Sequence, residues 1–144
     1  MRVYVDANVF LQAIGGDQRS RDPGRVLVEA MGAGAFAAET SAETLQEVVH
    51  HRLRMTDPDA TGQARAVAAV CEKLHPLDAE VARAALDLID ANPRLWSRDA
   101  IHAATARSAG LRHLLSADSH FDDIPDVLRI DPLDSDAIAA LVNE

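Results

Sequence analysis

The sequence predicts an α/β fold around a mainly parallel sheet of about four to five strands. Short apolar runs that suit buried strands alternate with longer helical stretches, which is the pattern of parallel sheets covered by helices. Hydrophobic residues make up 48% of the chain but aromatic residues only 3%, which favours alanine-rich helical packing over a β-sandwich. No repeat or linker interrupts the 144 residues, so we expect a single domain over residues 1–144.

The elements of the first half are predicted from apolar runs and helix caps. The Asp22-Pro23 pair is a strong helix start, because Asp caps a helix and Pro suits its first position. Thr40 or Ser41 caps the next helix. The expected order is strand 2–5, helix 8–14 closed by Gly15 and Gly16, loop 17–21, helix 22–31, strand 35–39 and helix 41–54.

The second half follows the same signals. Asp57-Pro58 repeats the cap-and-proline pair, while Asp78, Ser97 and Asp134 are further helix caps. We expect the helix that starts at Asp57 to pack antiparallel to its predecessor, because the connection is short. The expected order is helix 57–74, helix 78–92, helix 97–110, strand 113–116, a turn or short helix 119–124, strand 127–130 and helix 134–142.

Four acidic residues stand where a structural role is hard to assign. Asp6 ends the apolar run of the first strand, and Asp118 follows the apolar residues 114–117. The carboxyl edge of a parallel sheet is where open α/β folds keep their sites. Glu47 and Asp99 lie on predicted helices. Gathered carboxylates repel one another unless protons or cations intervene, and oxygen ligands suit Mg²⁺ or Mn²⁺. The set indicates metal-dependent chemistry on a phosphate substrate.

The net charge of −9 argues against nonspecific nucleic-acid binding through the overall field. A nuclease remains compatible with it, because a metal cluster inverts the local sign of charge. The single cysteine, Cys71, excludes an intramolecular disulfide and a cysteine-based zinc site. The N-terminus lacks the apolar segment of a signal peptide, and no apolar run approaches ~18 residues. We therefore expect a cytoplasmic protein without a membrane span.

Four segments in order resemble the motifs of PIN-domain ribonucleases. These segments are residues 3–10 around Asp6, 41–48 around Glu47, 99–104 opened by Asp99, and 115–121 around Asp118. The resemblance spans residues 1 to about 132. In size and single-domain build the chain most resembles VapC, the toxin of bacterial VapBC toxin–antitoxin pairs. It implies a PIN-like three-layer α/β/α sandwich.

The resemblance also implies a metal-dependent endoribonuclease that cleaves RNA with a metal-activated water. Asp6, Asp99 and Asp118 would bind one or two Mg²⁺ or Mn²⁺ ions, with Asp6 central, and Glu47 would hold a water or the second ion. A VapB-like antitoxin and a homodimer are the implied partners. Such antitoxins fill the acidic pocket, and a basic segment would suit an acidic cleft.

At several positions the sequence leaves two interpretations of the side chain open. Glu43, one turn before Glu47, is its rival as a ligand. Asn8 either bonds Asp6 or a metal-bound water, or caps a helix, or does both. Asp122 is either an outer ligand or a solvated acid. His102, on the helix of the third motif, is expected to be packed in the core rather than ligating.

The fourth motif departs from the family pattern in two ways. Ser116 replaces the usual Thr but keeps the hydroxyl, and His120 stands where a further acid often follows. Arg94 and Arg98 flank Trp96 in the loop before Asp99. The arginines are either RNA contacts or solvated cations, and the tryptophan either stacks a base or is partly buried.

Three other functions compete with the toxin. One is a PIN nuclease of RNA maturation or turnover without an antitoxin, which the absence of a short upstream reading frame would favour. Another is a catalytically silent binding module, against which the four retained acids argue. The third is a haloacid-dehalogenase-like phosphatase, which needs Asp-x-Asp after the first strand. The chain has Asp6-Ala7-Asn8 there, so this function is discounted.

Overall fold

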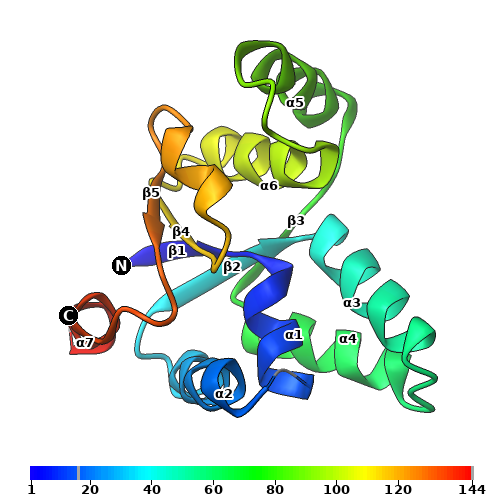
Figure 1. Ribbon diagram of the computed structural model, residues 1–144, viewed down its shortest axis with the longest axis vertical. Helices are drawn as coiled ribbons and strands as arrows, with labels where there is room; N and C mark the ends of the chain where they lie inside the picture. Colours follow the sequence, from blue (N-terminus) through cyan, green and yellow to red (C-terminus); the bar gives the residue numbers. More distant parts are fainter. Residues whose placement is uncertain (16, 144) are drawn as a thin grey trace.

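The strands run parallel in one five-stranded sheet with the order β3-β2-β1-β4-β5 (Figure 1). This computed structural model describes residues 1–15 and 17–143. The predicted parallel α/β fold is therefore confirmed. The strands are β1 (Arg2–Val5), β2 (Ala37–Ser41), β3 (Lys73–His75), β4 (His113–Leu115) and β5 (Leu128–Ile130).

Helices cover both faces of the sheet, which makes three layers (Figure 1). The helices are α1 (Ala7–Gly15), α2 (Gln18–Gly32), α3 (Ala42–Arg54), α4 (Ala60–Val70), α5 (Ala79–Ala91), α6 (Ser97–Ser108), the short 3₁₀ helix η1 (Ser119–Asp123) and α7 (Ser135–Asn143). Of these helices, none combines the length and the apolar character that a membrane span requires.

Side chains along each strand point alternately to the two faces of the sheet, so the core has two parts, one on each face. Tyr4 and Leu114 point toward α5, α6 and η1, where the core includes Phe121. Val3 and Val5 point the other way, onto α1, α2, α3, α4 and α7. This split follows from the period of two in a strand, because neighbouring side chains lie on opposite faces.

The connections place a switch point between β1 and β4. The chain proceeds outward from β1 to β2 and β3, and then returns through α5 and α6 to β4 on the other side of β1. In open parallel sheets, a crevice for ligands forms beyond the carboxyl ends of the strands at such a point. The segments containing Asp6 and Asp118 follow directly from β1 and β4.

Several predicted boundaries are wrong. The predicted helix 57–74 contains two elements, because α4 occupies only Ala60–Val70 and the edge strand β3 follows it. Helix α2 begins at Gln18, so Pro23 lies inside it, and the segment predicted as a loop is mostly helical. The second strand begins and ends two residues later than predicted, at Ala37 and Ser41.

The physical reasons are local. Asp17 accepts hydrogen bonds from both the backbone N–H and the hydroxyl of Ser20, at 3.0 Å each, and this cap starts α2 before Asp22. Ser97 is the first residue of α6 rather than its cap, and Trp96 precedes it without a capping hydrogen bond. Gly16, which we expected to close α1, lies outside the described residues.

Candidate metal centre and substrate groove

Asp6 is a buried acid at the end of β1. Its side chain is held by two hydrogen bonds to Oδ2, from Ser116 Oγ at 2.7 Å and from Asn8 Nδ2 at 2.8 Å. Burial raises the pKa of Asp6, and the charge of His102 together with the Ser116 hydrogen bond offsets this only in part. A further positive charge close to Asp6 would therefore stabilise its ionised carboxylate.

Ser116 and Asn8 connect the first motif to the fourth. Besides its bond to Asp6, Ser116 Oγ accepts from Asn8 Nδ2 at 2.9 Å and from the backbone N–H of Asp118 at 3.0 Å. Asn8 Oδ1 accepts from the backbone N–H of Ala117 at 3.2 Å. Asn8 lies within α1 and bonds Asp6, as one of its two interpretations predicts. These bonds fix the β4 loop against the start of α1.

His102 lies between Asp6 and Glu47 with only 1% of its surface exposed. Its Nε2 is 3.3 Å from Glu47 Oε1 and 3.4 Å from Asp6 Oδ1. On the other side of the ring, Nδ1 is 2.6 Å from the hydroxyl of Tyr4. That hydroxyl donates its proton to Ser41 Oγ at 2.7 Å. When Nδ1 carries a proton, it donates to the Tyr4 oxygen.

The charge of His102 follows from these contacts. Burial alone would lower the pKa of His102, but the contact with Tyr4 and the charges of Asp6 and Glu47 raise it well above the ordinary value. The raised pKa favours the imidazolium form, whose charge offsets those of the two carboxylates. His102 is packed, as expected, but it also belongs to the acidic cluster, which sequence reasoning missed. The sequence did contain a signal for this placement: His102 follows Asp99 by three residues, which puts both side chains on one face of the helix.

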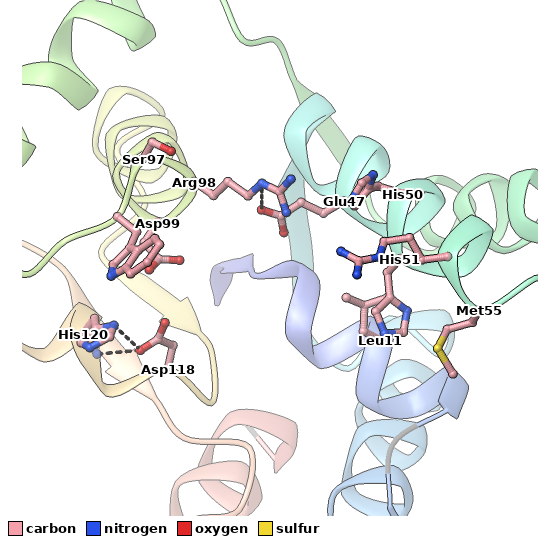
Figure 2. Close-up of a pocket in the computed structure, with 12 residues that line it drawn as sticks. Leu11, Glu47, His50, His51, Met55, Ser97, Arg98, Asp99, Asp118 and His120 are labelled. Carbon is pink, nitrogen blue, oxygen red and sulfur yellow. Dashed lines mark hydrogen bonds and ion pairs between the residues drawn. The ribbon is translucent and has the colours of Figure 1, made fainter.

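Asp99, Asp118 and His120 form a second group. Asp118 Oδ1 accepts from the backbone N–H of His120 at 2.9 Å and lies 3.1 Å from His120 Nδ1 (Figure 2). One ligand atom from each of the three residues lies within 4.8 Å of the others. Burial, followed by the charges of Asp118 and Asp6, raises the pKa of Asp99 to about 6. His120 was noted in the sequence as a departure from the family pattern, not as a site residue.

The structure therefore brings the four predicted acids to one edge of the sheet but divides them between two groups. Asp6 and Glu47 lie with His102, whereas Asp99 and Asp118 lie with His120. The groups are electrostatically linked, because the charges of Asp6 and Glu47 contribute to the raised pKa of Asp99. Such coupled carboxylates titrate jointly.

The two other candidate acids lie outside both groups. Glu43 Oε1 is 3.9 Å from Arg98 Nε, and burial, then the charge of Glu47, raises its pKa. Asp122 is exposed and pairs with Arg129 Nε at 2.7 Å, which agrees with its interpretation as a surface acid. Arg129 also donates to the backbone carbonyl of Ser116 at 3.0 Å, so this pair supports the β4 loop rather than the acidic cluster.

A groove of about 800 Å³ opens over the acids. Glu47 of α3 lies across it from Asp99 and Asp118 (Figure 2). Cationic and aromatic side chains surround the acids, and Asp6 lies below the lining with 4% of its surface exposed. The lining consists of Leu11, Glu47, His50, His51, Arg54, Met55, Trp96, Ser97, Arg98, Asp99, Asp118 and His120.

The donor atoms fit a divalent cation. Burial raises the pKa of Asp6 and Asp99, so each carboxylate gains from a nearby positive charge. His120 Nδ1 is shielded from water, and although Asp118 Oδ1 lies 3.1 Å away, no contact among the described residues has the geometry of a hydrogen bond to this nitrogen. Carboxylate oxygens suit Mg²⁺, and a set that adds an imidazole nitrogen also suits Mn²⁺.

Comparison with known proteins gives a consistent result. A family model described as the PIN domain matches residues 3–127. Ribonuclease VapC7 of Mycobacterium tuberculosis is 37% identical over 132 residues, which cover 90% of this chain and 91% of that protein. Ribonuclease VapC13 of the same organism is 26% identical over 129 residues, which cover 89% of this chain and 98% of that protein.

Solved structures share the fold at low sequence identity. The complex VapBC2 from Rickettsia felis, bound to a promoter DNA fragment, matches with a TM-score of 0.71 and 14% identity, covering 91% of this chain and 98% of that one. VapC20 of Mycobacterium tuberculosis, described as a Sarcin-Ricin loop cleaving toxin, matches with a TM-score of 0.68 and 18% identity, covering 83% and 92%. The five-stranded parallel sheet flanked by helices is the fold of these proteins.

Proposed function

Because this chain belongs to the PIN-domain family and is similar to VapC ribonucleases along most of its length, we propose that it is a divalent-metal-dependent endoribonuclease. One observation carries the proposal. Four carboxylates from separate parts of the sequence lie in two adjacent groups beyond the carboxyl ends of β1 and β4, where the switch point of the sheet opens a groove. A cluster of one buried and three partly buried acids in this position is costly without a cation.

Each acid has its own task in this proposal. Asp6, Glu47, Asp99 and Asp118 are the catalytic and metal-binding residues, with Asp6 as the central ligand. A divalent cation held by them supplies Lewis acidity and lowers the pKa of a bound water. Ser116 and Asn8 keep Asp6 Oδ2 in one orientation. His102 holds a proton between Asp6 and Glu47 and fixes Glu47 toward the cluster.

The biological role that we propose is that of a toxin inhibited by a VapB-like antitoxin. The solved relatives that support this are complexes of both components, such as VapBC2. An acidic cleft in a protein of net charge −9 complements a basic inhibitory segment. A homodimer, inferred from the resemblance, is part of the same proposal.

The decisive experiment compares RNA cleavage by the wild-type protein and by Asp6→Asn with Mg²⁺, Mn²⁺ or EDTA. The amide oxygen can keep the hydrogen bonds from Ser116 and Asn8, so the fold should persist while the ligand charge is lost. We expect metal-dependent cleavage that falls at least about 100-fold in the variant, since even outer-shell changes cost 10–100-fold. Metal should also raise the melting temperature of the wild type more than that of the variant.

Asp90→Asn is the matched control. It makes the same chemical change at an exposed position of α5, outside the groove, and should leave cleavage unchanged. Equal cleavage by wild type and Asp6→Asn, or cleavage that persists in EDTA, would contradict the proposal. Cleavage by the wild type alone, combined with inhibition by the product of an adjacent short reading frame, would support the toxin over an RNA-maturation nuclease.

A further inference from the structure

Trp96 is a large aromatic side chain that the fold leaves in water. It is the chain's single tryptophan, and 75% of its surface is exposed. The preceding residue, Leu95, is 5% exposed and packs into the core beside α5 and α6. The loop before α6 thus turns leucine inward and tryptophan outward. Because an indole gains more than most side chains from burial, this exposure favours an occupant that covers the ring.

The indole lies on the lining of the groove that contains the acids. Trp96 precedes Asp99 by three residues, and both belong to the lining, together with Asp118. Exposed apolar side chains are common on protein surfaces, but this one is placed beside a predicted reaction centre. Its position therefore points to a role in holding the substrate.

Positively charged side chains line both walls of the groove that contains the indole. Arg98 of α6 is 51% exposed, and Arg54 of α3 is exposed on the opposite wall beside His50 and His51. Arg98 Nε lies 3.9 Å from Glu47 Oε1, so this cation reaches toward the acid of the opposite wall (Figure 2). Arg98 and Arg54 therefore place positive charge beside the acids of the groove, which would otherwise repel the phosphates of a nucleotide strand.

We propose that Trp96 is a stacking platform for one unpaired base of the RNA strand, with Arg98 and Arg54 contacting the neighbouring phosphates. An aromatic face combined with separated cations matches a nucleotide strand, which alternates flat bases with negative charges. The base must be unpaired, because in an A-form duplex the neighbouring bases cover its faces. This inference rests on the proposed function and specifies its substrate class as single-stranded or looped RNA.

Trp96 serves as its own probe, since fluorescence excited where tyrosine does not absorb comes from this residue alone. The titrations use Asp6→Asn protein in Mg²⁺ buffer, so that the RNA is not cut. The probes are a mixed-sequence single-stranded RNA oligonucleotide, the same strand in a duplex, and the same strand with abasic sites. We expect quenching by the single strand and little quenching by the duplex or the abasic strand.

Variants in the same background measure the contribution of the ring. By fluorescence anisotropy of labelled single strand, Trp96→Ala should weaken binding about 10-fold, within the range for one stacked base, and Trp96→Phe should retain most of the affinity. Leu86→Ala, which truncates a 62% exposed leucine on α5, is the control and should bind as its parent does. Unchanged affinity in Trp96→Ala, or equal quenching by duplex and single strand, overturns the inference. Trp96 would then be assigned to contact with a protein partner.

The failure of this inference is distinguishable from the failure of the proposed function. Metal-dependent cleavage by the wild type with no effect of Trp96→Ala on binding rejects the stacking platform alone. An absence of metal-dependent cleavage rejects the nuclease, whatever the fluorescence shows.

Discussion

Ser116 occupies a fully buried position in which one hydroxyl makes three hydrogen bonds. It donates to Asp6 and accepts from Asn8 and from the backbone N–H of Asp118. A hydroxyl has one donor and two acceptor sites, so its capacity is used completely. This one oxygen atom therefore links the orientation of Asp6 to the start of the Asp118 loop.

Replacing this hydroxyl should weaken the metal site more than the fold. In Ser116→Ala, Asp6 keeps only the bond from Asn8, and the Asp118 N–H loses its acceptor, so we expect metal affinity and cleavage to fall about 10–100-fold. The free energy of unfolding should fall by about 1–3 kcal/mol. Calorimetric titration with Mn²⁺ and urea unfolding would measure the two effects.

Ser116→Thr is the matched variant, because it restores the hydroxyl and adds only a methyl group. It should recover most of the metal affinity that the alanine variant loses. If Ser116→Ala binds Mn²⁺ as tightly as wild type does, the hydroxyl does not orient Asp6 for metal.

Three helix starts were predicted correctly because the capping side chain acts on its own neighbours, although the equally local cap of Asp17 on Ser20 was missed. Ser41 accepts from the N–H of Thr44 at 3.4 Å, and Asp78 accepts from that of Val81 at 2.9 Å. Asp134 likewise accepts from the N–H groups at the start of α7. These contacts span two or three residues, so the local sequence contains all the information that they require.

Elements that depend on distant partners were not predictable in the same way. Strand β3 has three residues, and it exists because it pairs with β2, as in the register Ser41↔His75. Similarly, each of the four acids could be found from its own motif, but their division into two groups could not. That division depends on where α6 crosses the end of β1 and inserts His102 between Asp6 and Glu47.

Helices α1 and α2 approach closely at Gly24. A Cβ added there would lie 2.9 Å from the backbone N of Ala13 and 3.2 Å from the carbonyl oxygen of Val9. Backbone atoms of a packed helix cannot move aside as a side-chain end can. Gly24→Ala should therefore lower the free energy of unfolding by about 1–3 kcal/mol, despite the higher helix propensity of alanine.

Gly32, in the same helix, provides the control. An added Cβ there meets no atom within 4 Å, so Gly32→Ala should leave stability unchanged or raise it by up to about 1 kcal/mol. Urea unfolding of both variants tests the contrast. Equal effects of the two substitutions would mean that the contact between α1 and α2 is looser than the structure indicates.

At the scale of the whole molecule, three adjacent strands are joined by one buried carboxylate. Glu39 of β2 accepts from Arg2 Nε of β1 at 2.7 Å and from His75 Nε2 of β3 at 2.6 Å. Burial alone would raise the pKa of Glu39, but these two hydrogen bonds outweigh it and hold the pKa below its ordinary value of 4.5. The charged form of Glu39 thus stabilises the sheet.

The direction of the pH dependence follows from this shift. A carboxyl whose pKa is lower in the folded state contributes stability above its unfolded pKa and loses that contribution as the pH falls through the folded pKa. The contribution of Glu39 should therefore be complete at neutral pH, decline below about pH 4.5, and vanish below the folded pKa. Protonation of the remaining acids acts in the opposite sense through net charge, because it reduces the self-repulsion of a chain with charge −9.

Glu39→Gln separates the two effects, since it removes one titrating group and leaves the other acids in place. At neutral pH the variant should be less stable by about 2 kcal/mol, the range for hydrogen bonds to a charged group. The difference from wild type should shrink as the pH falls below 4.5 and disappear in stronger acid. Urea unfolding at a series of pH values measures it, with Glu29→Gln, at an exposed position of α2, as the control. A difference that stays constant across the series would show that Glu39 stabilises the sheet through packing rather than charge.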